Sequence, residues 1–404
     1  MTSEIKTLEG PTSGMRTINA SSLIGVCLMV GLLAGCGGPQ HKPTVRVGLI
    51  AELSGDLPAV GASSKNAAEL AVRQVNSAGG LIIGGQAYQV ELAVEDNASK
   101  ADQSAVAAQK LVSDSGVVAI VGPNASLGAI PAAEIAESAK IVLITPWSTN
   151  PKTTLDARTG APKKYVFRAC FTDPFEGHVL AKFAIGHMRA HRAAILYDRS
   201  SEAPKSQSDL FTSIFTELGG TIVASETYTT GDKDFSVQLT KINQSAPEVI
   251  FLPAYYNDVP LVVQQAQRLG VKAPFLGSDA WSSPDLIKLS GDAVEGFYFC
   301  NHYAADAATP ETARFIQAYS IQYGRTPDDV AALTYDAMGL LFEALKGAGR
   351  IERQATRDAL AKIPTYTGVT GTMRFPEGSG DPIKSAVILQ IRGGKFVWVT
   401  NVIP

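Results

Sequence analysis

Cysteine and histidine are scarce in this 404-residue sequence, which contains four cysteines and five histidines. They are too few and too scattered to predict a metal site. An excess of one charge is also missing, because 35 basic and 38 acidic residues give a net charge of −3. A nucleic-acid-binding surface needs a clustered basic excess, so the composition argues against that class of protein.

Motifs that are typical of enzymes are missing as well. No G-x-G-x-x-G follows a predicted strand, and no P-loop, G-x-S-x-G or H-E-x-x-H motif is present. His187 and His191 lie four residues apart, but such a pair is more typical of a solvated helix end than of a metal site. We therefore expect a protein that is not an enzyme and that uses no cofactor and no metal.

Long apolar runs are confined to the N-terminal region. Arg16 precedes an apolar run from Leu23 to Leu33, which is short for a membrane span and fits the core of a signal peptide. The run ends in Leu33-Ala34-Gly35-Cys36, which resembles a bacterial lipobox and implies lipid on Cys36; a simple signal peptide with a chance cysteine is the alternative. We expect residues 1–35 to be removed, residues 36–43 to form a linker, and the protein to be periplasmic or otherwise extracytoplasmic, held on the membrane by its lipid anchor only.

Short β-branched runs alternate with amphipathic segments from residue 45 onward. This pattern occurs twice, in a first unit that ends near residue 150 and in a second unit between about 170 and 296. Predicted strands cover 45–50, 88–95, 116–121, 141–144, 193–197, 221–228, 249–252 and 275–276, and predicted helices cover 64–77, 102–113, 132–139, 175–188, 206–218, 235–244 and 258–269. Two further helices, 311–323 and 330–346, precede a predicted hairpin with a Gly393-Gly394 turn.

Strands that alternate with helices at this spacing predict an α/β fold with parallel sheets covered on both faces. Open α/β sheets bind ligands beyond the carboxyl ends of their strands. Two similar units that face each other would therefore form a cleft between them.

Four short motifs occur in a characteristic order: Leu53-Ser54-Gly55, Ala78-Gly79-Gly80-Leu81, Ile144-Thr145-Pro146 and the segment from Gly231 to Ser236. In this order and spacing the chain resembles the branched-chain amino acid-binding proteins of ABC importers, which are type I periplasmic binding proteins. The resemblance covers nearly the whole chain after the N-terminal leader.

The resemblance implies two Rossmann-like lobes joined by three crossing strands, with a ligand cleft that closes by a hinge. It implies that lobe 1 comprises residues 44–169 and 299–374, and that lobe 2 comprises residues 170–298 and 375–404. The expected partners are a small-molecule ligand, such as an amino acid, and ABC permease subunits; we expect a monomer that binds no nucleic acid. A ligand sensor that signals to a receptor or regulator is the alternative, and the export signal favours the importer subunit.

Candidate ligand contacts in the first unit follow two predicted strands. Ser126 opens a helix whose free N–H groups suit a carboxylate, and it aligns with the family's carboxylate-binding serine; its alternative role is a helix cap. The family uses the segment of Trp147, Ser148 and Thr149 to contact the ligand's amino and carboxylate groups. Trp147 replaces a small residue there, so it either walls the pocket or packs between the lobes.

Candidate contacts in the second unit also lie just past strands. Tyr255 matches a family tyrosine that contacts ligand, and Asp279 matches the acid that pairs with the ligand's ammonium group; a turn-forming aspartate is the alternative. Two positions depart from the leucine-binding pattern. Val60 stands in place of an aromatic residue, and Glu202 falls where a tyrosine is usual. Glu202 either favours a cationic or hydroxylated ligand or points to solvent.

Cys170 and Cys300 remain once the leader and the lipidated cysteine are set aside. The resemblance places both where the chain crosses between lobes, and an oxidising compartment would permit a disulfide between them. Two buried thiols in a packed hinge explain the same residues. Both interpretations stay open at the level of sequence.

Overall fold

The computed structural model describes residues 42–403. The predicted signal peptide, the proposed lipidation site Cys36 and residues 37–41 of the predicted linker lie outside the described residues. No helix between residues 42 and 403 combines the length and the apolar character that a membrane span requires.

The first lobe is built on a six-stranded sheet with the order β2-β3-β1-β4-β5-β6. Strands β1, β3, β4, β5 and β6 are parallel, while the short β2 pairs antiparallel with β3. All five residues of the central strand β4 are buried, as expected for a parallel strand covered on both faces. The elements of this lobe's first part are β1 (Thr44–Ala51), α1 (Pro58–Ser77), β2 (Leu81–Ile83), β3 (Gln86–Asp96), α2 (Ala101–Ser113), β4 (Val117–Val121), α3 (Ser126–Ser138), β5 (Val142–Thr145), the 3₁₀ turn η1 (Pro151–Thr153) and β6 (Val166–Arg168).

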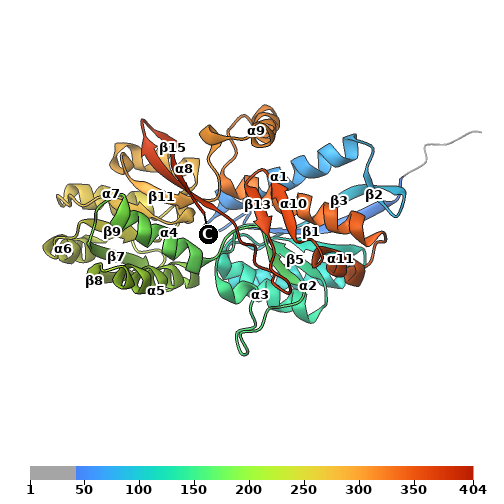
Figure 1. The fold of residues 1–404 in the computed structure, drawn as a ribbon, viewed down its shortest axis with the longest axis horizontal. Coiled ribbons are helices and arrows are strands. Elements are labelled where there is room, and N and C mark those ends of the chain that lie inside the picture. Colours follow the sequence, from blue (N-terminus) through green and yellow to red (C-terminus); the bar gives the residue numbers. More distant parts are fainter. Residues whose placement is uncertain (1–41, 404) are drawn as a thin grey trace, which may run out of the picture. The chain divides into compact units, whose positions relative to one another are not determined.

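The second lobe contains a seven-stranded sheet with the order β15-β14-β11-β10-β9-β7-β8. Strands β7 to β11 pair parallel, and the C-terminal hairpin adds β14 and β15 antiparallel at one edge. Figure 1 shows this hairpin in red. The elements are α4 (Asp173–Gly186), β7 (Arg192–Asp198), α5 (Glu202–Glu217), β8 (Thr221–Tyr228), α6 (Ser236–Gln244), β9 (Val249–Leu252), α7 (Val259–Arg268), β10 (Phe275–Gly277), η2 (Asp279–Trp281), α8 (Pro284–Ser290), η3 (Gly291–Val294), β11 (Tyr298–Asn301), β14 (Ala386–Arg392) and β15 (Lys395–Val402).

The chain returns to the first lobe after β11. Helices α9 and α10 pack against α1, and α10 also contacts β4 and β5. The returning elements are η4 (Ala305–Ala307), α9 (Pro310–Tyr323), α10 (Asp329–Ala348), α11 (Arg353–Leu360), β12 (Thr365–Gly368) and β13 (Gly371–Arg374). The described chain therefore passes between the two sheets after β6, after β11 and after β13.

The prediction of a two-lobed α/β fold is confirmed, with differences in the bounds of several elements. Strand β11 belongs to the second sheet, whereas the predicted boundary assigned residues from 299 onward to lobe 1. Helix α1 begins at Pro58, six residues before the predicted start at 64, because proline suits the first turn of a helix. The C-terminal hairpin turns through Gly393 and Gly394, both with positive φ, as a two-residue hairpin loop of this kind requires.

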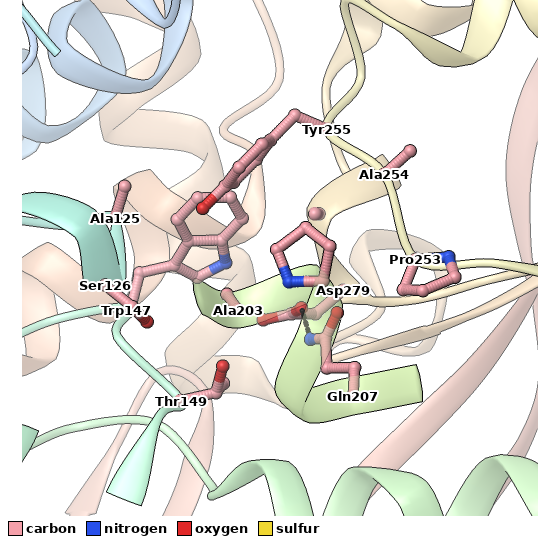
Figure 2. A pocket seen from close by; sticks show the side chains of 12 residues that line it. Ala125, Ser126, Trp147, Thr149, Ala203, Gln207, Pro253, Ala254, Tyr255 and Asp279 are labelled. Carbon is pink, nitrogen blue, oxygen red and sulfur yellow. Dashed lines mark hydrogen bonds between the residues drawn. The ribbon is translucent and has the colours of Figure 1, made fainter. Parts of the chain in front are cut away.

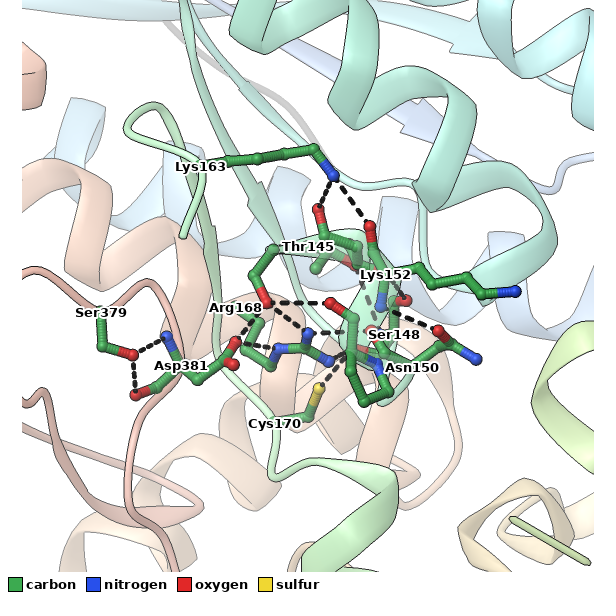
Figure 3. A network of polar contacts seen from close by, with 12 residues as sticks. Thr145, Ser148, Asn150, Lys152, Lys163, Arg168, Cys170, Ser379 and Asp381 are labelled. Atoms are coloured by element: carbon green, nitrogen blue, oxygen red, sulfur yellow. Dashed lines mark hydrogen bonds and ion pairs between the residues drawn. The ribbon is translucent and has the colours of Figure 1, made fainter. Parts of the chain in front are cut away.

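A fully buried arginine joins the first and third crossings (Figure 3). The Nε of Arg168 lies 2.6 Å from Oδ1 of Asp381, and its guanidinium also donates to the backbone carbonyls of Ser148 and Asn150. Because a guanidinium presents several donors in one rigid plane, it fixes the loop after β5 against the crossing segments. This loop carries three of the predicted ligand contacts.

The disulfide interpretation is wrong in this structure, because Cys170 and Cys300 are both free thiols. Cys300 lies inside β11, between β10 and β14, and the segment after β6 passes close to the end of this strand, where the rings of Phe171 and His302 stack with centroids 3.9 Å apart. Cys170 instead donates its thiol proton to the carbonyl of Ser148, with an Sγ–O distance of 3.2 Å. Burial raises the pKa of both thiols, which keeps them protonated and inert.

Candidate ligand-binding site

A cavity lies between the lobes (Figure 2). The first lobe contributes residues from the loops after β4 and β5, and the second lobe contributes residues from α5 and from the loops after β9 and β10. The lining residues are Ala125, Ser126, Trp147, Thr149, Ala203, Pro204, Gln207, Pro253, Ala254, Tyr255, Asp279 and Ala280. The cavity therefore lies beyond the carboxyl ends of strands from both sheets, where open α/β sheets bind their ligands.

The N-terminus of α3 forms one end of this cavity. A buried carboxylate, Glu52, lies directly after β1 and accepts hydrogen bonds from the backbone N–H groups of Asn124 and Ala125, both at 3.1 Å. Its other oxygen accepts from the amide of Asn124 at 2.7 Å. Glu52 thereby fixes the loop that leads into the helix. The next N–H groups, those of Ser126 and Leu127 at the start of α3, have no partner within the helix and carry a partial positive charge.

Two hydroxyl groups supplement the helix terminus. Ser126, the first residue of α3, is 2% exposed and accepts a hydrogen bond from the Ser148 hydroxyl at 2.9 Å. Its own proton is then free to donate toward the cavity. Ser148 is within hydrogen-bond distance of Thr153 as well, at 2.7 Å, so it orients Ser126 from behind. Thr149 lies beside them on the cavity wall. This end of the cavity suits an anion.

A carboxylate forms the opposite end. Asp279, which follows β10, is 3% exposed and lies 3.1 Å from Nε2 of His302 and 3.4 Å from the amide of Gln207. Within residues 42–403, no lysine or arginine forms an ion pair with Asp279. Burial lowers the pKa of His302, so the ring is neutral and, with its proton on Nε2, donates to Asp279 without balancing its charge.

Further acids lie behind Asp279. Glu176 of α4 accepts from the backbone N–H of Asp279 and from Gln207, both at 2.7 Å. Burial and the charge of Asp279 raise the pKa of Glu176 well above its usual value. Burial also raises the pKa of Asp173 to about 6, although the nearby hydroxyls of Thr149 and Ser206 act in the opposite direction. This end of the cavity is electronegative and suits a cation.

Two aromatic rings separate the cavity from its neighbours. The rings of Trp147 and Tyr255 lie near each other, tilted by 48°, with centroids 6.2 Å apart. Trp147 and Ala280 also line an inner cavity. Tyr255 and Ala125 also line an outer cavity. The site is therefore a chain of three spaces, and the polar groups described above surround the middle one.

The structure brings five of the predicted residues together around the middle cavity, and they are Ser126, Trp147, Thr149, Tyr255 and Asp279. Ser148 lies behind the wall and contacts Ser126. Glu202 does not line the cavity; it forms an ion pair with Lys152 at 2.5 Å, and its side chain is 47% exposed. Val60 lines the inner cavity.

Sequence reasoning missed Gln207, Glu176 and Glu52. A signal existed for Glu52, because it is the acid that directly follows the first apolar strand. Gln207 is a polar residue on the mostly apolar buried face of α5, a position at which a buried polar group needs a partner. Among residues 42–403, no group of three or more histidine, cysteine, aspartate or glutamate side chains is arranged to hold a metal ion.

Two α/β lobes with a polar cavity between them define a two-lobed small-molecule-binding protein. The family model described as periplasmic binding protein matches residues 44–395, and the chain belongs to this family. This match confirms the resemblance seen in the sequence. A substrate-binding role and an extracytoplasmic location follow from the family.

Known proteins of the same kind resemble the chain over most of its length. It is 31% identical to the Leu/Ile/Val-binding protein BraC3 of Rhizobium johnstonii, over 82% of this chain and 88% of that one. The leucine-binding protein LivK of Thermotoga maritima has a TM-score of 0.82 and 32% identity, over 89% of this chain and 99% of that one. LivJ of Streptococcus pneumoniae, solved with isoleucine, has a TM-score of 0.81 and 30% identity, over 88% and 99%.

Proposed function

We propose that this protein is the solute-binding subunit of an ABC importer and holds one α-amino acid between its lobes by hinge closure. The observation that carries this proposal is the charge pattern of the cavity. An α-amino acid has a carboxylate and an ammonium group on the same carbon. The α3 N-terminus with Ser126 and Thr149 complements the first group, and Asp279 with its acidic neighbours complements the second.

Closure strengthens both contacts. A buried charge that lacks a charged partner is costly; within the described residues Asp279 contacts the neutral ring of His302 and forms no ion pair with a lysine or arginine. A ligand ammonium would supply that partner where water is excluded, and charge-assisted hydrogen bonds are the strong ones. Several relatives agree in substrate class; one from Pseudomonas aeruginosa, 25% identical, is named a leucine-, isoleucine-, valine-, threonine- and alanine-binding protein.

The proposal predicts that both charged groups of the ligand are needed. Calorimetry with a panel of α-amino acids should find at least one that binds, and its N-acetyl and carboxamide derivatives should bind at least about tenfold more weakly. Asp279→Asn should weaken the parent amino acid by roughly tenfold to a hundredfold. Glu202→Gln, which removes a charge outside the cavity lining, is the matched control and should stay within about threefold. Equal binding of the N-acetyl derivative would contradict the assignment of Asp279.

Export and anchoring belong to the same proposal. We propose that Cys36 carries lipid after the leader is removed, which places the binding protein beside the permease on the membrane surface. The alternative of a free ligand sensor predicts no dependence on a permease. Uptake of the bound amino acid is measured in cells that lack this protein and are complemented with the wild type or with Cys36→Ser. The wild type restores uptake only if the protein is an importer subunit, and Cys36→Ser tests whether the anchor is needed.

A further inference from the structure

The three cavities between the lobes differ in the side chains that line them. The inner cavity contains Val60, Tyr256 and Val330 among its lining residues, together with the acids Asp328 and Asp329. The outer cavity is lined by the apolar residues Leu57 and Leu127 and also by four acids, Glu52, Asp56, Asp198 and Asp258, without a lysine or arginine among its lining residues. A long apolar ligand side chain that entered the outer cavity would lie beside these acids, so we consider the inner side as its route.

The indole of Trp147 closes that inner side. It is 5% exposed and lines both the middle and the inner cavity. Its Nε1 donates to Oδ2 of Asp329 at 2.9 Å, and Asp329 is the first residue of α10. Rotation of the indole would leave a buried acidic oxygen without a donor, which is costly. The ring is therefore a fixed wall.

The backbone beneath the indole is equally constrained. The Ser148 N–H donates to the Thr145 hydroxyl at 3.3 Å, and the Arg168 guanidinium holds the carbonyls of Ser148 and Asn150. The loop therefore has little freedom to withdraw Trp147 when a larger ligand enters. The wall of the middle cavity on this side is therefore the indole itself.

From these contacts we infer that Trp147 is the specificity-determining residue of the site, and that it restricts the ligand to α-amino acids with a short side chain such as alanine or serine. The inference rests on the proposed function, which supplies the amino acid. The inner cavity is then a side-chain pocket that the indole keeps closed. Leucine-sized side chains are excluded by this one residue and by its hydrogen bond to Asp329.

The experiment compares alanine with leucine by calorimetry on the wild type, Trp147→Ala and Trp147→Phe. The wild type should bind alanine more tightly than leucine. Removal of the indole joins the middle and inner cavities, so Trp147→Ala should raise the affinity for leucine relative to alanine by about tenfold or more. Trp147→Phe keeps a ring in place and should retain the preference for alanine.

Each outcome decides a separate point. Wild-type protein that binds leucine as tightly as alanine overturns the inference without any variant, so the test survives even if Trp147→Ala does not fold. A folded Trp147→Ala protein with an unchanged ratio of affinities also overturns it, while amino-acid binding itself leaves the proposed function intact. If folded wild-type protein binds no α-amino acid of either size, the proposed function fails and the inference fails with it.

Discussion

Asp173 illustrates how single residues at the site are held in an unfavourable state. It is fully buried, and although the hydroxyls of Thr149 and Ser206 lie near it, neither carboxyl oxygen forms a regular hydrogen bond within the described structure. The neighbouring charge of Asp279 adds to the effect of burial, and that of Arg168 opposes it. Functional sites often retain such groups at a cost in stability. Here the cost keeps the cation-binding end of the cavity electronegative.

Replacement of Asp173 by asparagine should therefore stabilise the ligand-free protein. The pKa of Asp173 is raised from 3.8 to about 6. Below pH 3.8 the side chain is protonated in both the folded and the unfolded protein and costs no stability; the folded protein then loses stability relative to the unfolded chain as the pH rises from 3.8 through 6. Asp173→Asn should raise the free energy of unfolding by about 1–2 kcal/mol at pH 7 and by little at pH 4. Part of the gain is offset because an acid in the first turn favours α4. Urea denaturation at both pH values measures the free energy of unfolding, with Asp209→Asn at an exposed position as the control. A larger gain in stability at pH 4 than at pH 7 would contradict the predicted pH dependence.

At the scale of the element, helix α1 is positioned by its close approach to the end of β1. A Cβ on Gly61 would lie 2.2 Å from the backbone carbonyl oxygen of Glu52, far inside van der Waals contact. This approach places Glu52 where it can hold the loop before α3. The anion-binding end of the cavity thus depends on a glycine in a different helix.

Gly61→Ala should consequently destabilise the protein, although alanine is the better helix former. Backbone atoms must move to admit the methyl group, which typically costs about 1–3 kcal/mol. Gly186→Ala is the matched control, because Gly186 is also helical and a Cβ there meets no atom within 4 Å; this change should be neutral or stabilising by up to about 1 kcal/mol. Thermal denaturation of the two variants checks the pair, and equal melting temperatures would rule out the steric explanation.

Four of the predicted contacts, Ser126, Thr149, Tyr255 and Asp279, were predicted from the resemblance to the family. Each also lies just past an apolar run, and the carboxyl ends of parallel strands converge, so the pattern of the sequence agrees with the resemblance. Glu202 was misplaced because α5 begins at residue 202 rather than near 206, which turns the predicted loop contact into a helix residue that faces Lys152.

Residues on helices were harder to predict. Glu176 and Gln207 meet behind Asp279 only because α4 and α5 pack side by side. Such packing is a tertiary feature that periodicity within one helix does not reveal. The thiols show the same limit, since the neighbours of Cys300 depend on the order of strands in the sheet.

At the scale of the whole binding unit, few polar contacts cross between the lobes away from the crossing segments. Lys152 of η1 pairs with Glu202 of α5 at 2.5 Å, and the amide of Asn257 donates to the carbonyl of Asp56 at 3.4 Å. The aromatic pair Trp147 and Tyr255 adds an apolar contact. Weak contacts of this kind suit a cleft that opens and closes, because a strong interface would hold the lobes together without ligand.

The ion pair between Lys152 and Glu202 should accordingly favour the closed state by a small amount. Both side chains are about half exposed, and exposed pairs contribute about 0.2–1 kcal/mol. Lys152→Glu places two carboxylates opposite each other and should weaken ligand binding by up to about fivefold. Adding Glu202→Lys should restore the affinity, because the pair is re-formed with its charges exchanged. Lys205→Glu makes the same change in net charge at an exposed position of α5 and should have little effect.

Small-angle scattering connects that affinity change to the motion. Saturating ligand should reduce the radius of gyration of the wild type. Lys152→Glu should need more ligand for the same reduction, and the difference should shrink at high salt, since salt screens exposed charges. If saturating ligand leaves the radius of gyration of the wild type unchanged, the proposal that the lobes close on the ligand is wrong. If the double variant binds as weakly as Lys152→Glu, the effect of Lys152 comes from its own position and not from the pair across the cleft.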